Sequence, residues 1–411
     1  MNERWHERKE EARLAAEQPP SGYDWARRAI TILAIIGGIA LGLVFLRDAV
    51  SSALLFILIL IALVMAHEAG HFFTAKAFGV YVHEFGIGFP PRAWAFKHGE
   101  TEYSLNWLPV GGFVRLEGEE ESEHPRSLSV RPWWQRLTVL GSGAVVNLIL
   151  PVFLFAAALT FPHEVAIGRS VISEVIPDSP AEAAGLQSGD VIYTIAGRDA
   201  LNVAETSRYI RVNVGKTIDL VVRRDGEFIT VPVEARRSPP AGQGPTGISI
   251  APAVVAPDGR PFTETESQPP WESFPNGFRQ TWDTLILAQN EIRSWFGGST
   301  GPQFAGPIGI GQTVGNVAQS QDSASDAVSP LLELAALLSI NLGVLNLLPL
   351  PMLDGGRIFF LLIEIARGGK RIAPEKEALV HMAGFAIFIS FALVVTFLDI
   401  SRIANGESVF R

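Results

Sequence analysis

Long apolar runs constrain this chain most, because a bilayer core requires a helix of about 20 mostly apolar residues. Runs of that size predict five transmembrane helices, over residues 29–46, 49–66, 137–161, 334–353 and 378–398. The first two should form a tight helical hairpin, since only Arg47 and Asp48 separate them. The first is expected to be retained rather than cleaved as a signal peptide, because its charged leader is long.

The composition agrees with a membrane protein and excludes several kinds of site. Hydrophobic residues make up 48% of the chain and charged residues 18%, which is typical of membrane proteins. The net charge of −9, with no basic stripe, argues against a nucleic-acid surface. Because there is no cysteine, thiolate zinc sites and cysteine nucleophiles are excluded. Any metal must be held by His, Asp, Glu or main-chain oxygen.

Lysine and arginine in short loops predict the orientation in the membrane. These residues concentrate in the tail 1–28 and in the connection 354–376, so both segments should be cytoplasmic. The segment 162–330 and the C-terminus should then be extracytoplasmic.

A metal-binding pattern, "AHEAGHFF" at residues 66–73, follows the second apolar run. His67 and His71 are four residues apart, so on a helix they share one face and can reach one zinc ion. Glu68 beside them is placed to take a proton from the attacking water. A chance match and a histidine pair satisfied by hydrogen bonds are the alternatives. Ionisable residues within a membrane are costly and usually functional, which weakens both.

A catalytic zinc ion needs a third protein ligand. Ala77 occupies the place of a third histidine in the longer form of the motif, which leaves Glu84 and Asp354. Asp354 ends the stretch "NLLPLPMLDGG", residues 346–356, where prolines and glycines break the fourth span. Irregular backbone at membrane depth is tolerated only where it is buried in protein or lines a wet cavity. A simple membrane-exit turn remains the alternative for Asp354.

These motifs resemble those of the site-2 protease family of intramembrane zinc metalloproteases. "HEAGH" fits the family's H-E-x-x-H signature and "NLLPLPMLDG" its N-x-x-P-x-P-x-L-D-G signature. The order of spans resembles the bacterial regulator-of-sigma-E protease branch, over roughly residues 54–397. The resemblance implies that His67, His71 and Asp354 bind one zinc ion, that Glu68 is the catalytic base, and that Glu84 has a structural or surface role. It also implies cleavage of a membrane-anchored regulator, such as an anti-sigma factor, in a bacterial cytoplasmic membrane.

Weaker matches to the family indicate residues that could contact the substrate. The stretch 102–119, "EYSLNWLPVGGFVRLEGE", resembles the family's membrane-associated β-hairpin, whose free edge could pair with an unwound substrate. A plain cytoplasmic hairpin is the alternative. The candidates are Gly111, Gly112 and Phe113 in this stretch, Asn147 at the end of "GSGAVVN", and Asn346. For the two asparagines, an ordinary interhelical hydrogen bond is the alternative. His381, in the last span, is interpreted as a packing residue.

The extracytoplasmic segment contains a stretch, residues 171–200, that resembles a PDZ domain. Strands are expected at 171–176, 217–223 and 228–234, and a helix at 202–213. Such a module could bind a peptide or a substrate C-terminus, or act as a spacer or steric gate. Residues 271–297 predict an amphipathic helix at the outer membrane–water boundary, or alternatively one packed on the PDZ module.

The expected fold is therefore an α-helical polytopic membrane protein with a β-hairpin and an inserted α+β PDZ domain. The expected divisions are 1–28 tail, 29–46 extra helix, 49–161 first half of the core, 163–237 PDZ domain, 238–270 linker, 271–297 amphipathic helix, 298–330 connection, 331–398 second half of the core, and 399–411 tail. The expected partners are single-span membrane substrates and the lipid bilayer, with no nucleic acid. The alternative function is a PDZ-bearing membrane scaffold with a vestigial metal site.

Overall fold

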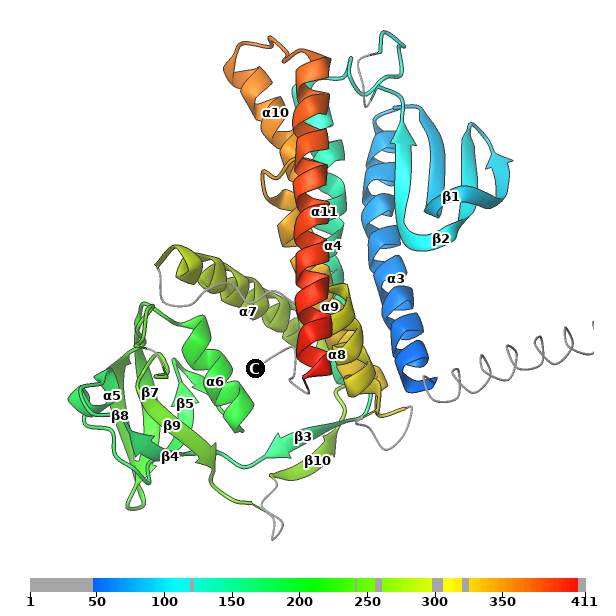
Figure 1. Ribbon diagram of the computed structural model, residues 1–411. Coiled ribbons are helices and arrows are strands. Elements are labelled where there is room, and N and C mark those ends of the chain that lie inside the picture. Colours follow the sequence, from blue (N-terminus) through cyan, green and yellow to red (C-terminus); the bar gives the residue numbers. More distant parts are fainter. Residues whose placement is uncertain are drawn as a thin grey trace, which may run out of the picture. The chain divides into compact units, whose positions relative to one another are not determined.

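The computed structural model describes residues 47–118, 122–240, 242–255, 261–297, 306–319 and 325–405 (Figure 1). The predicted tail 1–28 and the predicted extra helix 29–46 lie outside the described residues. The chain divides into two compact units, residues 1–54 and 55–411. The boundary falls within the first described helix, and the metal centre lies in the second unit.

Among the described residues, four helices are long and apolar enough to cross a membrane. They are α3 (Arg47–Ala77), α4 (Trp133–Thr160), α9 (Val328–Leu347) and α11 (Pro374–Ala404). These helices contain or overlap the last four predicted runs, so the protein is a multi-pass membrane protein. Helix α9 ends at Leu347 because Pro349 and Pro351 cannot donate a main-chain hydrogen bond. Two shorter helices, α8 (Pro307–Gln319) and α10 (Asp354–Ala366), flank α9 in the sequence.

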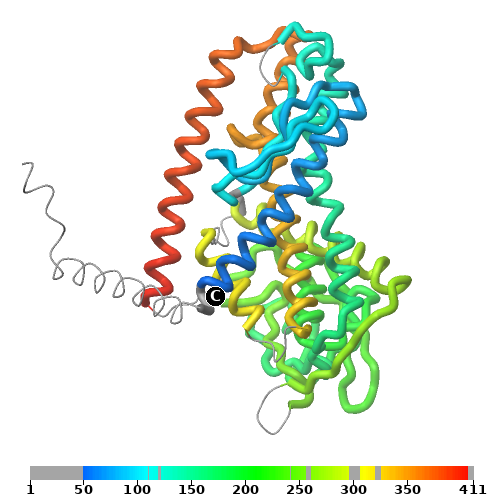
Figure 2. Tube along the Cα trace, turned by 90° about the vertical axis from the view of Figure 1, so that its right-hand side faces the viewer, coloured from blue at the N-terminus to red at the C-terminus, as the bar shows by residue number. Residues whose placement is uncertain are grey.

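Helix α4 is the centre of the helical part, because it packs against α7, α9 and α10. Close approach to α9 depends on Gly343, where a Cβ would lie 3.1 Å from Ala144 O. Ser339 Oγ of α9 donates to Asn147 O of α4 at 2.8 Å. Small residues and interhelical hydrogen bonds are the usual means of helix association in lipid. Helix α11, red in Figure 2, runs apart from the others for most of its length.

The β-hairpin is larger than the sequence indicated. Strand β1 (Val82–His98) follows α3 directly, and β2 (Thr101–Leu116) contains most of the predicted stretch 102–119. Phe85 lies opposite both Val114 and Tyr103, so β2 folds back along both sides of the first part of β1. The reversal occurs near Gly111, whose φ is +81°, a conformation that glycine adopts easily.

An α+β module follows α4. Its sheet has the order β8-β7-β5-β4-β9, with β6 paired to β5. The elements are β4 (Ser170–Val175), α5 (Pro180–Ala183), β5 (Val191–Ile195), β6 (Arg198–Asp199), α6 (Val203–Val212), β7 (Thr217–Arg224), β8 (Glu227–Glu234) and β9 (Ile248–Pro252). Helix α6 begins where Asn202 accepts a hydrogen bond from Glu205 N, an N-cap. The expected strands and helix are therefore present within a residue or two.

The predicted linker 238–270 contains two strands, so that prediction was too broad. Ile248 and Ile250 of β9 pack against the core of the module, and β9 pairs with β4 along its length. Strand β10 (Phe262–Glu266) pairs instead with β3 (His163–Ile167). Each strand is only five residues long and lies in a Pro- and Gly-rich segment, so its alternating pattern was too short to predict a strand.

Helix α7 (Pro270–Gly297) packs on both the membrane helices and the module. Its Gly277 lies against Val152 O and Ala156 N of α4, where a Cβ would come within 2.6 and 2.7 Å. On the module side, Asp283 Oδ2 pairs with Arg198 Nη1 at 2.6 Å. The helix still exposes aromatic side chains, namely Trp271, Phe274, Phe278, Trp282 and Trp295.

Candidate metal centre

Helix α3 presents His67 and His71 on one face, toward α4. The helices approach closely because Gly70 and Ser142 meet, and a Cβ on Gly70 would lie 2.7 Å from Ser142 O. Thr74 and Ser142 share a hydrogen bond of 2.9 Å one turn further along. Both histidines are buried, with exposed fractions of 7% and 9%.

Asp354 reaches the same point from the first turn of α10. Gly355 and Gly356 allow α10 to start against the end of α9, because side chains there would collide with Leu348 O and Leu350 O. The stretch of prolines and glycines that interrupts the predicted span thus brings the Asp354 carboxylate into contact with His71, although the two residues are 283 positions apart in sequence.

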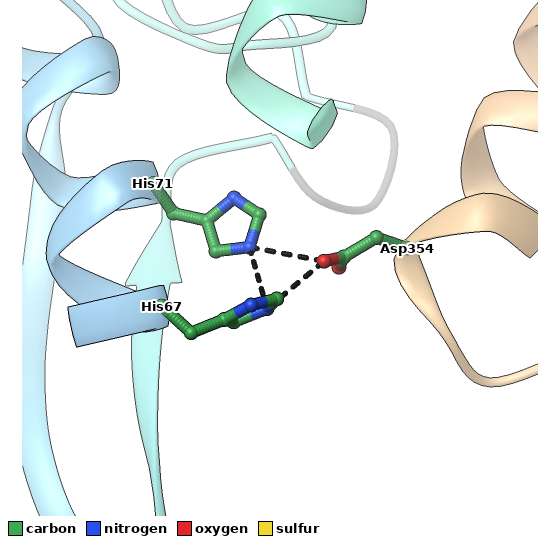
Figure 3. Close-up of side chains that lie close together, drawn as sticks. All are labelled: His67, His71 and Asp354. Carbon is green, nitrogen blue, oxygen red and sulfur yellow. Dashed lines mark hydrogen bonds and ion pairs between the residues drawn. The ribbon is translucent and has the colours of Figure 1, made fainter. Parts of the chain in front are cut away.

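Three donor atoms converge in this centre (Figure 3). Asp354 Oδ2 lies 3.0 Å from His67 Nε2 and 3.2 Å from His71 Nε2, and the two nitrogens are 3.2 Å apart. Nitrogen and oxygen ligands about 2.0–2.1 Å from a tetrahedral zinc ion would lie roughly 3.3 Å from one another. Two imidazoles and one carboxylate are also a usual ligand set of a catalytic zinc ion. The donor set therefore fits zinc.

Gly143 of α4 faces the same point. A Cβ there would lie 2.7 Å from His67 Nε2 and still closer to His71 Nε2. The absence of a side chain leaves room beside the ligand nitrogens. The sequence stretch "GSGAVVN" contained this residue, but only a three-dimensional arrangement identifies its role.

The second ring nitrogen of each histidine also has a neighbour. A histidine that binds metal through Nε2 carries a proton on Nδ1, which needs an acceptor. His71 Nδ1 lies 2.7 Å from Val139 O. His67 Nδ1 lies 3.3 Å from Asn147 Nδ2, while Asn147 Oδ1 has no hydrogen-bond partner among the described residues. Turning the amide, whose two ends are easily interchanged, places the oxygen opposite His67, where it accepts the proton on Nδ1.

Asn147 was nominated as a substrate-handling residue, with an interhelical hydrogen bond as the alternative. The structure places it fully buried on α4, behind His67. Asn346, nominated with it, is buried in the last turn of α9.

Glu68 and the β-hairpin border the centre. Glu68 lines a cavity of about 230 Å³ together with His71, Asp354 and Phe113. A Cβ on Gly112 would lie 3.5 Å from Glu68 Cγ, so β2 passes directly beside this glutamate. Phe113 and Gly112 therefore lie at the centre, whereas Gly111 lies against the ring of Phe89.

Glu84, the rival third ligand, lies elsewhere in the hairpin. Its buried carboxylate pairs with Arg92 Nη2 at 2.8 Å and with Arg115 Nη2 at 3.1 Å. Two arginines already neutralise it, so it fits a structural role in the sheet.

Comparisons with known proteins agree on one family. The profile of peptidase family M50 matches residues 55–391. A Clostridium perfringens protein whose name carries the words zinc metalloprotease is 33% identical over 344 residues, which cover 82% of this chain and 95% of that protein. The zinc metalloprotease RasP of Oceanobacillus iheyensis is 29% identical, with 85% of this chain and 98% of that protein covered. The RasP of Geobacillus kaustophilus is 27% identical, with 86% and 99% covered.

Proposed function

The chain belongs to peptidase family M50 and is a membrane-embedded zinc metalloprotease, and from this premise we propose that it cleaves single-span membrane proteins within or near their transmembrane segment. The observation that carries the proposal is the position of the metal centre. His67 and His71 lie in the membrane-length helix α3, and both are buried in the protein. A peptide bond must therefore reach the level of the membrane helices to be hydrolysed.

His67, His71 and Asp354 would hold the zinc ion. When bound, zinc acts as a Lewis acid that polarises the scissile carbonyl and makes water more acidic. Glu68 borders the cavity beside these ligands and takes the proton of the attacking water. The protonated Glu68 then returns that proton to the leaving amide nitrogen. Val139 O and Asn147 hold the two imidazoles in the tautomer and orientation that ligation requires.

The substrate must lose its helical structure at the cleaved bond, because helix carbonyls are already hydrogen-bonded. Strand β2 offers a surface for the unwound segment, since Gly112 lies beside Glu68 and Phe113 lines the cavity. Pairing of an extended substrate with this strand would bring its main chain to the metal. Helix-breaking or small residues in the substrate would favour such unwinding.

The α+β module is proposed to be a PDZ domain that selects substrates outside the membrane. Strand β9 ends the sheet order and α6 lies beside it, an arrangement that suits the addition of a peptide strand. The module is also fixed to α7 by the ion pair of Arg198 and Asp283, which suits a steric gate that admits shortened substrates.

The physiological substrate class is a membrane-anchored regulator, such as an anti-sigma factor, already trimmed outside by another protease. The proposed location is the bacterial cytoplasmic membrane, with the N-terminus in the cytoplasm and the module outside. The clustering of Lys and Arg in residues 1–28 and 354–376 supports this orientation.

Glu68→Gln tests the proposal. The purified full-length variant in detergent should retain zinc, because Glu68 is not a ligand, yet cleave a single-span substrate about 10²- to 10⁴-fold more slowly. Glu227→Gln, at the exposed first position of β8, is the matched control, and it should retain both zinc and activity. In cells that carry Glu68→Gln, quantitative proteomics should find membrane-anchored fragments that accumulate.

Unchanged cleavage by Glu68→Gln would contradict the catalytic assignment. Wild-type protein that binds no zinc by elemental analysis would favour the scaffold with a vestigial site.

A further inference from the structure

The main chain that leads to Asp354 is held in an unusual way. Between α9 and α10, Pro349 and Pro351 have no N–H group to donate. Leu350 N donates to Leu348 O at 2.7 Å, and Leu353 N donates to Leu350 O at 3.3 Å. These bonds are local and close small turns, but they leave the main-chain N–H of Met352 to be satisfied from elsewhere.

Met352 also adopts a conformation that side-chain-bearing residues avoid. Its φ is +76°, in the left-handed region. Such a conformation is strained and persists only where the surroundings of the residue hold it. Because Met352 lies two residues before Asp354 and lines the same cavity, its conformation directs the chain into the metal centre.

The group that holds Met352 comes from α11. Met352 N donates to His381 Nδ1 at 2.7 Å. The ring of His381 packs near Phe360, with centroids 5.5 Å apart, and its Nε2 lies 3.8 Å from Glu377 Oε1. The imidazole therefore packs between neighbours on α10 and α11, and its Nδ1 must be the unprotonated nitrogen in order to accept.

A second contact from the same helix supports this loop. Gly384 lies nearly one turn after His381, and a Cβ there would collide with Pro351. Helix α11 thus touches two successive residues of the loop, Pro351 and Met352, through one glycine and one hydrogen-bond acceptor. Elsewhere α11 packs on α8, where Asp399 Oδ2 accepts a hydrogen bond from Gly309 N at 2.8 Å, and it runs apart from α3 and α4 for most of its length (Figure 2).

We propose that His381 is a positioning residue of the metal centre. By accepting the N–H of Met352, it holds the loop so that the Asp354 carboxylate meets His67 and His71. This inference rests on the assignment of Asp354 as a ligand. His381 was interpreted from the sequence as a packing residue. The proposal instead gives its Nδ1 atom the role of accepting the hydrogen bond from Met352 N.

A pair of amide variants tests the role of that nitrogen. Asn places its carbonyl oxygen where Nδ1 of histidine lies, whereas Gln places its oxygen nearer to the position of Nε2. The zinc affinity of full-length protein in detergent is measured by competition with a zinc chelator, with the metal alone as the probe. His381→Gln should weaken zinc binding about 10- to 100-fold. His381→Asn should bind zinc about as tightly as the unsubstituted protein.

Two further measurements separate positioning from a general effect on folding. The kcat for a single-span substrate should fall in His381→Gln while KM stays the same, and the apoprotein should melt as the wild type does. Gly384→Ala perturbs the same loop from the other contact and should also weaken zinc binding. Met382→Ala, at an adjacent position that is 63% exposed, is the control and should change neither zinc binding nor kcat.

Equal zinc affinity in His381→Gln, Gly384→Ala and the wild type would overturn the proposal. Equal weakening in His381→Asn and His381→Gln would also overturn it, since the ring rather than Nδ1 would then matter. The zinc measurement needs no substrate, so a failure to cleave single-span proteins would refute the proposed function without affecting this comparison.

Discussion

In the α+β module, Ile172, Ile192 and Leu220 are fully buried in one apolar core, whereas the buried side chains at the metal centre are His67, His71 and Asn147. The module excludes water from apolar surface, which is the main driving force in soluble domains. Between helices in lipid that force is absent, so glycines and hydrogen bonds decide how closely the helices approach. An added methyl group on a glycine should therefore disturb the metal centre most, whereas removal of a large apolar side chain should disturb the module most.

The largest effect is expected from Gly143→Ala. The new Cβ would press against the Nε2 atoms of both histidines and displace them from Asp354. Because displacement of a reacting group by about 1 Å can cost 10²-fold, zinc affinity and cleavage should each fall by at least about 100-fold. Chelator competition and a cleavage assay in detergent measure both.

Gly141→Ala is the matched control for Gly143→Ala. It adds the same methyl group to the same helix, but the nearest atom, Ile358 Cδ1, is 3.9 Å away. It should leave zinc binding and cleavage unchanged. If both variants behaved alike, close packing at Gly143 would not be what shapes the centre.

A smaller effect, confined to the other region, is expected from Leu220→Ala. Loss of this fully buried side chain should destabilise the module by about 2–5 kcal/mol, through lost burial and the cavity left behind. Hydrogen exchange of β5 and β7 in the full-length protein measures the loss of protection. Zinc affinity should not change.

Leu201→Ala, at a residue that is 53% exposed, is the comparison for Leu220→Ala and should cost within about 0.5 kcal/mol. Weakened zinc binding in Leu220→Ala alone would mean that the two regions are energetically coupled.

The smallest effect concerns Glu100, in the turn between β1 and β2. Hydrogen bonds from Arg126 and Lys76, at 2.5 and 2.6 Å, lower the pKa of this carboxyl to about 2. Because the pKa is lower in the folded protein, the stabilisation is present at neutral pH. It should be lost as the pH falls from about 4.5 toward 2. The loss should be only about 0.2–1 kcal/mol, since the pair is partly exposed to water.

Hydrogen exchange of the β1–β2 sheet at decreasing pH measures this loss, and Glu100→Gln should remove the pH dependence that Glu100 contributes. An identical acid response in both proteins would assign the response to other groups.

Several features could be predicted from particular residues. The apolar runs predicted α3, α4, α9 and α11, and alternation with turn signals predicted β7 and β8 almost to the residue. His67 and His71 followed from helical spacing. The sequence left Glu84 and Asp354 open as third ligands, and the resemblance to a known family favoured Asp354. Two short strands, β9 and β10, were missed because five residues in a Pro- and Gly-rich segment carry little periodic signal.

The sequence by itself determined where helices of membrane length occur and which residue types could bind a metal, because both depend on local composition and on a period of 3.6 residues. Only the tertiary structure brought Asp354 to the two histidines, paired Glu84 with arginines, and placed Gly143, Asn147 and His381 around the centre. Except for the pair of Glu84 and Arg92, these contacts join segments distant in sequence. Their geometry depends on how closely helices pack, and that is set by glycines and single hydrogen bonds with no local pattern to reveal them.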